Sequence, residues 1–221
     1  MPARLNTRER IIHASLELFN AQGERSVTTN HIAAHLGISP GNLYYHFRNK
    51  QVIVAELFSA YETWVDGFLR LPADRALRLE DKAPYLESLL QAVWRYRFLH
   101  RDLEHLLEAD PELAARYRRF AARCLARAKH IYQGFVDAGI LRMTPPQVEA
   151  LALNAWIITT SWVRFLCSTG ESTVTIDETL LRRGIYQLLT LEDGYVVEDA
   201  RPALMMLYER LYVPLNIPSD E

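Results

Sequence analysis

The sequence predicts an all-α protein, with a three-helix unit at residues 1–50 and a larger helical domain at residues 51–221. Apolar residues recur three and four positions apart in each long segment, as they do along one face of an α-helix. Residues typical of helix starts and ends separate these segments. No stretch longer than residues 195–197 alternates in the way that a β-strand does.

Composition and charge indicate what kind of partner the chain has. Its 221 residues, of which 49% are hydrophobic, are enough to bury a sizeable core. Residues 1–55 carry six basic and three acidic side chains, which gives +3, and the remainder carries 19 and 24, which gives −5. The two parts sum to the net charge of −2. A basic head on an acidic body favours contact between the head and a polyanion.

We expect no membrane segment and a reducing compartment. The N-terminal residues MPARLNTRER are charged and lack the apolar core of a signal peptide. The most apolar run, residues 151–167, contains Asn154 and Arg164 and is short for a membrane span, so it predicts a buried helix. Cys124 and Cys167 have no spacing typical of a disulfide framework or a metal cluster, which fits the cytoplasm.

The first expected helix covers residues 7–22, ends at Gly23 and packs across the two helices that follow it. Those two are short. Thr28 and Ser39 are hydroxyl residues at N-cap positions, and Pro40 fits the first position of the second helix. Gly37 fits the left-handed residue that ends the first of them. Two short helices joined by such a turn form a helix-turn-helix.

The second short helix has an apolar and a polar face. Leu43 and Phe47 lie four residues apart and are expected to pack on the preceding helix. The opposite face carries groups that can meet base edges or phosphates: Gly41, Asn42, Tyr45 and His46. Lys50 opens the following helix, whose N-terminal N–H groups would add to its charge at a phosphate. A structural module that touches no nucleic acid would leave this polar face unused.

Residues 28–50, TTNHIAAHLGISPGNLYYHFRNK, resemble the DNA-binding helix-turn-helix of the TetR family of bacterial transcriptional regulators. The resemblance covers about residues 8–55. For the rest of the chain it implies a helical regulatory domain for ligand binding and dimerisation. It also implies a cytoplasmic homodimer that binds double-stranded operator DNA, and a repressor that an unknown small-molecule effector releases.

The resemblance assigns DNA contacts to individual residues. The positions that would meet base edges in the major groove are Ser39, Gly41 (through its backbone), Asn42 and Tyr45. The positions that match the family's phosphate contacts are Thr29, Tyr44, His46 and Lys50. Asn30 and Pro40 depart from some family members, which leaves the operator sequence open.

Three alternative functions stay open at this point. The chain would serve as a transcriptional activator of the same fold, as a helical small-molecule-binding protein or enzyme with a relic DNA-binding head, or as an architectural DNA-bound protein without an effector. The intact polar head residues speak against a relic head. A sizeable closed pocket in the body would speak against an architectural role.

The body is expected to begin with a long helix at residues 49–70 that links it to the head, followed by a connector at residues 71–84. Further helices are predicted at residues 85–108, 110–137, 146–167, 177–191 and 199–213, with a loop at residues 170–175 and a turn at residues 193–194. The helix at residues 146–167 is apolar almost all round, so its second side needs a partner chain. Together with the helix at residues 177–191, it would form a four-helix bundle across a twofold axis. The expected interface residues are Ile158, Trp162, Phe165, Leu181, Ile185 and Leu188.

Aromatic residues of the body indicate an apolar or aromatic effector, although each of them could equally be an ordinary core residue. The candidates for the pocket are Tyr61, Trp64, Trp94, Phe98, Tyr117, Phe120 and Trp156. A basic stripe lies at helical spacing and would bind an acidic effector or, as we favour, form a solvated face: Arg116, Arg119, Arg123 and Arg127.

No pattern predicts catalysis, a metal site or a cofactor. His31 and His35 lie four residues apart, but a helix-borne zinc site needs a third ligand and usually a Glu between the two. The sequence contains no glycine-rich phosphate loop, no nucleophile elbow and no paired carboxylates. We therefore expect a protein that is not an enzyme.

Overall fold

The computed structural model describes residues 5–169 and 177–215. Within these ranges it contains ten α-helices and three short 3₁₀ helices, and the only β-type pairing is one isolated bridge between Leu141 and Val196. The all-α prediction is confirmed. The loop predicted at residues 170–175 falls outside the described residues.

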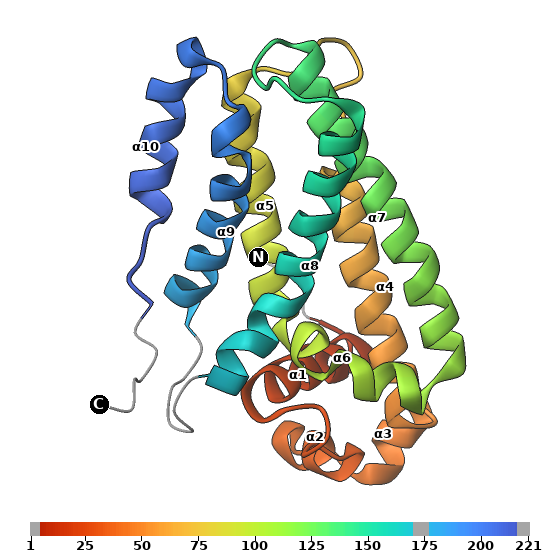
Figure 1. Cartoon of the computed structure of the whole chain (residues 1–221). Helices are drawn as coiled ribbons and strands as arrows, with labels where there is room; N and C mark the ends of the chain where they lie inside the picture. Colours follow the sequence, from red (N-terminus) through yellow and green to blue (C-terminus); the bar gives the residue numbers. More distant parts are fainter. Residues whose placement is uncertain (1–4, 170–176, 216–221) are drawn as a thin grey trace.

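The head lies at the lower end of the molecule and comprises α1 (Thr7–Gln22), α2 (Thr29–Leu36) and α3 (Pro40–His46) (Figure 1). Asn6 caps α1, because its side chain accepts a hydrogen bond from the backbone N–H of Glu9. Ile32 of α2 and Leu43 of α3 are fully buried, as the helical spacing predicted. The apolar core of the head continues without a break into α4, α6 and α7 of the body.

Helix α4 (Lys50–Phe68) runs from the head into the body (Figure 1). The next helices are η1 (Leu79–Asp81), α5 (Lys82–Arg95) and α6 (Arg97–Ala109), so the prediction of one helix at residues 85–108 is wrong. The helix is interrupted at Tyr96, where the side-chain amide of Asn20 bonds to the end of α5 and to the start of α6. Its Nδ2 donates to the carbonyl of Arg95 over 2.8 Å, and its Oδ1 accepts from the N–H of Phe98 over 3.1 Å. Asn20 thus satisfies backbone groups that a helix end leaves unpaired.

The remaining helices complete a bundle that stands on the head: α7 (Pro111–Asp137), α8 (Pro145–Thr169), α9 (Glu178–Glu192) and, at its outer edge, α10 (Arg201–Leu211) (Figure 1). Asp110 caps α7 by accepting from the N–H groups of Glu112 and Leu113. Gly139 follows α7 at a φ of 72°, the left-handed conformation that glycine adopts without strain. Two short helices, η2 (Asp193–Tyr195) and η3 (Glu198–Ala200), connect α9 to α10.

Most of the basic stripe on α7 is held in ion pairs with α4, whereas Arg119 is exposed. Arg116 and Arg123 both pair with Glu62 of α4 at 2.6 Å, and Arg127 pairs with Asp66 of the same helix. Three of the four arginines of the stripe therefore join α7 to α4. Sequence spacing placed these arginines on one face but could not show that α4 carries the matching carboxylates.

Helices α8 and α9 pack closely because Gly184 of α9 lies against Trp162 of α8. The indole Nε1 of Trp162 donates to the carbonyl of Leu180 over 2.9 Å, which fixes the ring across α9. A methyl group on Gly184 would lie 2.5 Å from Cδ1 of that ring. By length and composition α8 could also cross a membrane, but core helices share those properties, and α8 packs on α6, α7 and α9.

Several of the predicted dimer-interface residues are covered by their own chain. The three on α9 are Leu181, Ile185 and Leu188, and all of them are buried within the single chain. They are therefore core residues and not exposed interface residues. They form a core cluster with α5 and α8. Ile158, Trp162 and Phe165 of α8 are half-buried at the edge of the same cluster. The apolar character of these helices predicted burial but not which surface buries them.

The packing of Trp162 on Gly184 predicts opposite effects for two glycine-to-alanine substitutions. Gly184→Ala should lower the free energy of unfolding by about 1–3 kcal/mol, because the new methyl group forces the anchored indole to move. Gly67→Ala, in α4, meets no atom within 4 Å and should raise it by about 0.5–1 kcal/mol, as alanine favours the helix. Urea denaturation followed by circular dichroism, at one protein concentration, measures both. Stabilisation by both substitutions would show that the contact is loose.

Candidate DNA interface and effector cavity

Helix α3 exposes the polar face that the sequence predicts. Ser39 caps it by accepting a hydrogen bond from the N–H of Asn42 over 3.2 Å, and its own hydroxyl hydrogen is left to donate. Leu43 holds the helix to the head from the buried side. Gly41 and Asn42 are exposed, and Tyr45 is 85% exposed, the most of any large hydrophobic side chain in the described residues. Helix α3 itself lies at the lower end of the molecule, within the head (Figure 1).

The flanking residues form a second polar group beside this face. The hydroxyls of Thr29 on α2 and Tyr44 on α3 lie 3.0 Å apart, so each holds the other in place. The ring of His46 meets the ring of Tyr45 edge-on at 5.1 Å between centroids. The structure therefore brings Thr29, Tyr44 and His46 next to the face of α3 that carries Tyr45.

Lys50 has a structural role that the sequence did not predict. Its ammonium donates to the carbonyls of Glu24 and Val27 over 2.9 and 3.0 Å and lies 2.8 Å from the carboxylate of Glu24. Two of its N–H groups therefore bond to backbone carbonyls, and its charge pairs with that carboxylate. The phosphate contact predicted for Lys50 stays a prediction. In this arrangement Lys50 fastens the first turn of α4 to the loop between α1 and α2.

A cavity of about 140 Å³ lies in the body, between α4, α5, α7, α8 and α9. Three of the seven aromatic residues predicted for the effector pocket line it, namely Tyr61, Phe120 and Trp156. Tyr117 lines a much smaller neighbouring space, and Phe98 is buried in the core against Phe19. Trp64 and Trp94 line a surface hollow beside the head. These last four residues do not line the cavity. Helical periodicity in a sequence cannot separate core residues from cavity residues.

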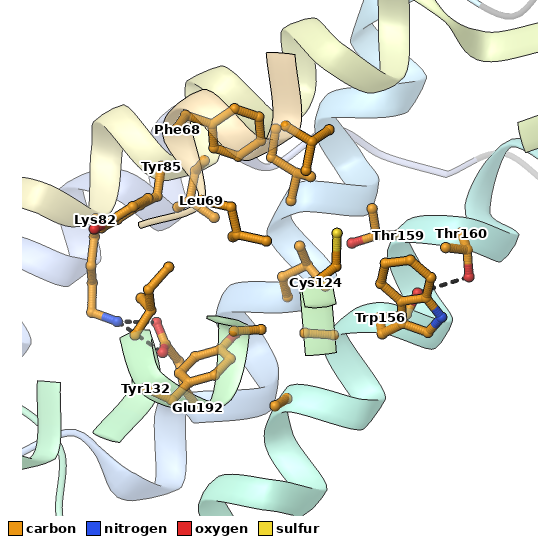
Figure 2. Close-up of a pocket in the computed structure, with 18 of the residues that line it drawn as sticks. Phe68, Leu69, Lys82, Tyr85, Cys124, Tyr132, Trp156, Thr159, Thr160 and Glu192 are labelled. Atoms are coloured by element: carbon orange, nitrogen blue, oxygen red, sulfur yellow. Dashed lines mark hydrogen bonds and ion pairs between the residues drawn. The ribbon is translucent and has the colours of Figure 1, made fainter. Parts of the chain in front are cut away.

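One end of the cavity is charged. Nζ of Lys82, on α5, lies 2.7 and 2.8 Å from the two carboxylate oxygens of Glu192, on α9, and 4.2 Å from the ring centre of Phe135. The side chains of the pair are 4% and 3% exposed. Figure 2 shows Lys82, Tyr132 and Glu192 at one end and Trp156, Thr159 and Thr160 at the other.

The other titratable groups near the cavity are held neutral by burial. Burial lowers the pKa of His100 to about 4, opposed in part by a hydrogen bond with the backbone of Thr160, and the Nε2 of His100 lies 3.2 Å from the Tyr61 hydroxyl. Burial raises the pKa of the Cys124 thiol to about 12. It also raises the pKa of the Tyr61 and Tyr132 hydroxyls. At neutral pH the wall is therefore apolar apart from hydroxyl groups and the Lys82–Glu192 pair.

Sequence reasoning missed Lys82 and Glu192 as cavity residues. They lie 110 positions apart, and in the sequence each is one charged residue among many at a helix end. A lysine and a glutamate acquire a special role only when the fold buries them together. The pair forms because the fold packs α5 against α9.

Two family models together match most of the chain. The model described as "Bacterial regulatory proteins, tetR family" matches residues 11–57, and the model described as "Bacterial transcriptional repressor" matches residues 60–204. The division between them falls inside α4. The first match covers the exposed face of α3, and the second covers the whole wall of the cavity.

Individual relatives agree with these matches. A solved TetR-family transcriptional regulator from Marinobacter aquaeolei VT8 is 48% identical, with a TM-score of 0.86, over 94% of this chain and 99% of that one. The HTH-type transcriptional regulator AcrR of Shigella flexneri is 33% identical over 145 residues, which are 63% of this chain and 67% of AcrR. The Tetracycline repressor protein class D of Escherichia coli is 46% identical over 55 residues, which span only a quarter of its length.

The contacts of Lys50 predict that its substitution destabilises the protein more than the loss of one exposed positive charge does. Lys50→Met should lower the free energy of unfolding by about 2–4 kcal/mol, because it leaves the buried carboxylate of Glu24 without its cation and two carbonyls without their donor. Arg48→Met removes the same charge from an exposed position nearby and should change stability by no more than about 0.5 kcal/mol. Denaturant titration of both variants compares them, and equal losses would rule out the structural role.

Proposed function

The chain belongs to the TetR family of bacterial transcriptional regulators, and from this premise we propose that it is a cytoplasmic homodimeric repressor that a small-molecule effector releases from operator DNA. The observation that carries the proposal is the combination of an exposed polar face on α3 with a separate cavity in the body. A transcription factor without an effector has no use for such a cavity. A ligand-binding protein without DNA has no use for Tyr45 at 85% exposure.

In the proposed complex, α3 enters the major groove of the operator. Asn42 presents a donor and an acceptor to an adenine edge, and Tyr45 reaches a thymine methyl group or a phosphate. The backbone approaches the DNA closely at Gly41, where no side chain stands in the way. Thr29, Tyr44 and His46 contact phosphates and fix the register, while Lys50 supports the head from within.

Helix α4 supplies the connection between cavity and head. Its first turn is held by Lys50, and Tyr61, Val65 and Phe68 near its other end line the cavity. A ligand that packs on these three side chains favours one position of a helix whose far end is bonded to the head. An effector acts by favouring a conformation in which the two heads no longer match successive major grooves, about 34 Å apart.

The proposed dimer uses the exposed face of α8. Leu153 and Ile157 are 47% and 50% exposed, and Asn154 and Ser161 complete the same stripe along the helix. This stripe replaces the buried residues of α9 that the sequence assigned to the interface. Pairing it across a twofold axis, with α9 alongside, forms a four-helix bundle and gives the two heads the symmetry of a palindromic operator.

The DNA-reading residues are tested by truncation. Asn42→Ala and Tyr45→Ala should each weaken binding to the operator by about 1–3 kcal/mol and leave the fold intact, because both side chains are exposed. Fluorescence anisotropy with DNA from the region around the protein's own gene measures this affinity. Tyr212→Ala removes an exposed tyrosine far from the head and serves as the matched control. If the two head variants bind like this control, α3 is not the reading helix.

The dimer surface is tested by placing a charge on it. Ile157→Arg should raise the dissociation constant of the dimer at least about 100-fold, since burying two unpaired charges at a twofold interface costs several kcal/mol. Met206→Arg changes a residue of α10 that is 69% exposed and should leave the dimer intact. Sedimentation of both variants across a range of concentrations provides the comparison. A dimer that survives Ile157→Arg unchanged places the interface elsewhere.

A further inference from the structure

The charged end of the cavity contains a carboxylate, Glu192, that can accept a further hydrogen bond. Two N–H groups of Lys82 are used by the two oxygens of Glu192, and the third hydrogen has only the face of Phe135 nearby. A carboxylate has about four acceptor sites, of which Lys82 fills two. Glu192 can therefore accept one further hydrogen bond from a ligand without giving up its partner. An O–H or N–H group on the ligand fits this acceptor.

The same end disfavours a charged ligand. Lys82 and Glu192 are the only charged side chains among the described residues that line the cavity, and their charges cancel. A carboxylate placed there would stand beside Glu192, and an ammonium would stand beside Lys82. Either one leaves a net charge in a buried site, where charge is costly. A neutral ligand avoids this cost.

The size and the walls of the cavity restrict the rest of the ligand. Its volume of about 140 Å³ is close to that of the engineered apolar cavity of roughly 150 Å³ that holds one benzene molecule. Aromatic rings face it from several sides: Tyr61, Phe68, Tyr85, Phe120, Tyr132, Phe135 and Trp156. Rings favour offset or edge-on contact with another ring. One aromatic ring with a small substituent fits without displacing the walls.

On the premise that this cavity is the effector site, we propose that the effector is a neutral compound with a single aromatic ring and an O–H or N–H donor that binds to the carboxylate of Glu192. The ring lies among the aromatic side chains of α4, α5, α7 and α8. The donor points to the end where α5 meets α9. Larger effectors of this class bind by moving α4, α7 or α8, whereas the Lys82–Glu192 end keeps its geometry.

A series of matched probes tests the class on the unmodified protein. Phenol carries the donor, anisole has the oxygen without the hydrogen, toluene has neither, and benzoate and benzylamine carry opposite charges at pH 7. Calorimetric titration should show phenol binding at least about tenfold more tightly than anisole or toluene, as expected for a hydrogen bond to a charged acceptor. Benzoate and benzylamine should bind at least about 100-fold more weakly than phenol. If anisole equals phenol, or either ion binds best, the proposal is overturned.

Two variants test which group of the protein accepts the hydrogen bond from the ligand. Lys82→Met combined with Glu192→Leu replaces the pair by apolar groups, a change that buried ion pairs often tolerate. This double variant should keep its affinity for toluene, which reports an intact cavity, and lose the preference for phenol over anisole. Thr159→Val removes a hydroxyl at the other end and should leave the preference within about threefold. A preference that survives the double variant, or disappears in Thr159→Val, shows that the ligand donates its hydrogen bond to another acceptor. If the double variant no longer binds toluene, its cavity is not intact, and Glu192→Gln is used in its place. In that variant a neutral amide replaces the carboxylate, and the preference for phenol over anisole should fall at least about threefold.

The outcome for the class of ligand is separate from the outcome for the proposed function. If phenol binds with the expected preference but operator affinity does not change in its presence, the ligand class stands and release of DNA by this cavity fails. If another compound competes with phenol for the cavity and releases the operator while the phenol preference is absent, the function stands and the class fails.

Discussion

The attachment of Lys50 to the loop between α1 and α2 makes the head move together with α4, and this constraint determines how the body can act on DNA. Because its ammonium holds two carbonyls and the carboxylate of Glu24, the first turn of α4 cannot move without the head. A second attachment lies at the α5–α6 junction, where Asn20 of α1 bonds to both helices and Arg101 of α6 donates to the carbonyl of Phe19. The head is thus fixed at two points, one on a helix that lines the cavity and one at the end of α5, whose first residue is Lys82.

The buried Lys82–Glu192 pair is more informative about function than about stability. An ion pair taken out of water gains little over well-packed apolar residues of the same volume, so stability alone does not explain it. It does supply a fixed polar group in a cavity whose other walls are mostly apolar and aromatic. A few placed polar groups in an apolar pocket are typical of small-molecule sites, since apolar area gives affinity and the polar groups give orientation. Helices α4 and α7, which also line the cavity, are joined by the pairs of Glu62 and Asp66 with Arg116, Arg123 and Arg127.

Local signals in the sequence predict most of the fold. The caps at Thr28, Ser39 and Asp110, and the left-handed glycines at positions 37 and 139, act within a few residues of themselves, so the helices of the head and the start of α7 follow from the sequence. The break at Tyr96 could not be predicted, because Asn20, which satisfies the backbone groups there, is 75 positions away from Arg95. The same limit applies to the sites. The exposed face of α3 is a local property, whereas the cavity and the partners of Lys50 and of the α7 arginines depend on which helices meet. The apolar pattern predicts that Leu181, Ile185 and Leu188 are buried, but the residues that cover them belong to the same chain and not to a second copy.

The central claim is that the cavity and the operator compete through the conformation of the dimer. Calorimetry of one compound that raises the melting temperature of the protein tests this most directly, with titrations into the free dimer and into the dimer saturated with operator. Linkage requires the operator to weaken binding of the compound by the same factor as the compound weakens binding of the operator, typically about 5–150-fold. The account predicts this equality of two factors, both well above one. Equal affinity of the compound for the free and the DNA-bound dimer would contradict it.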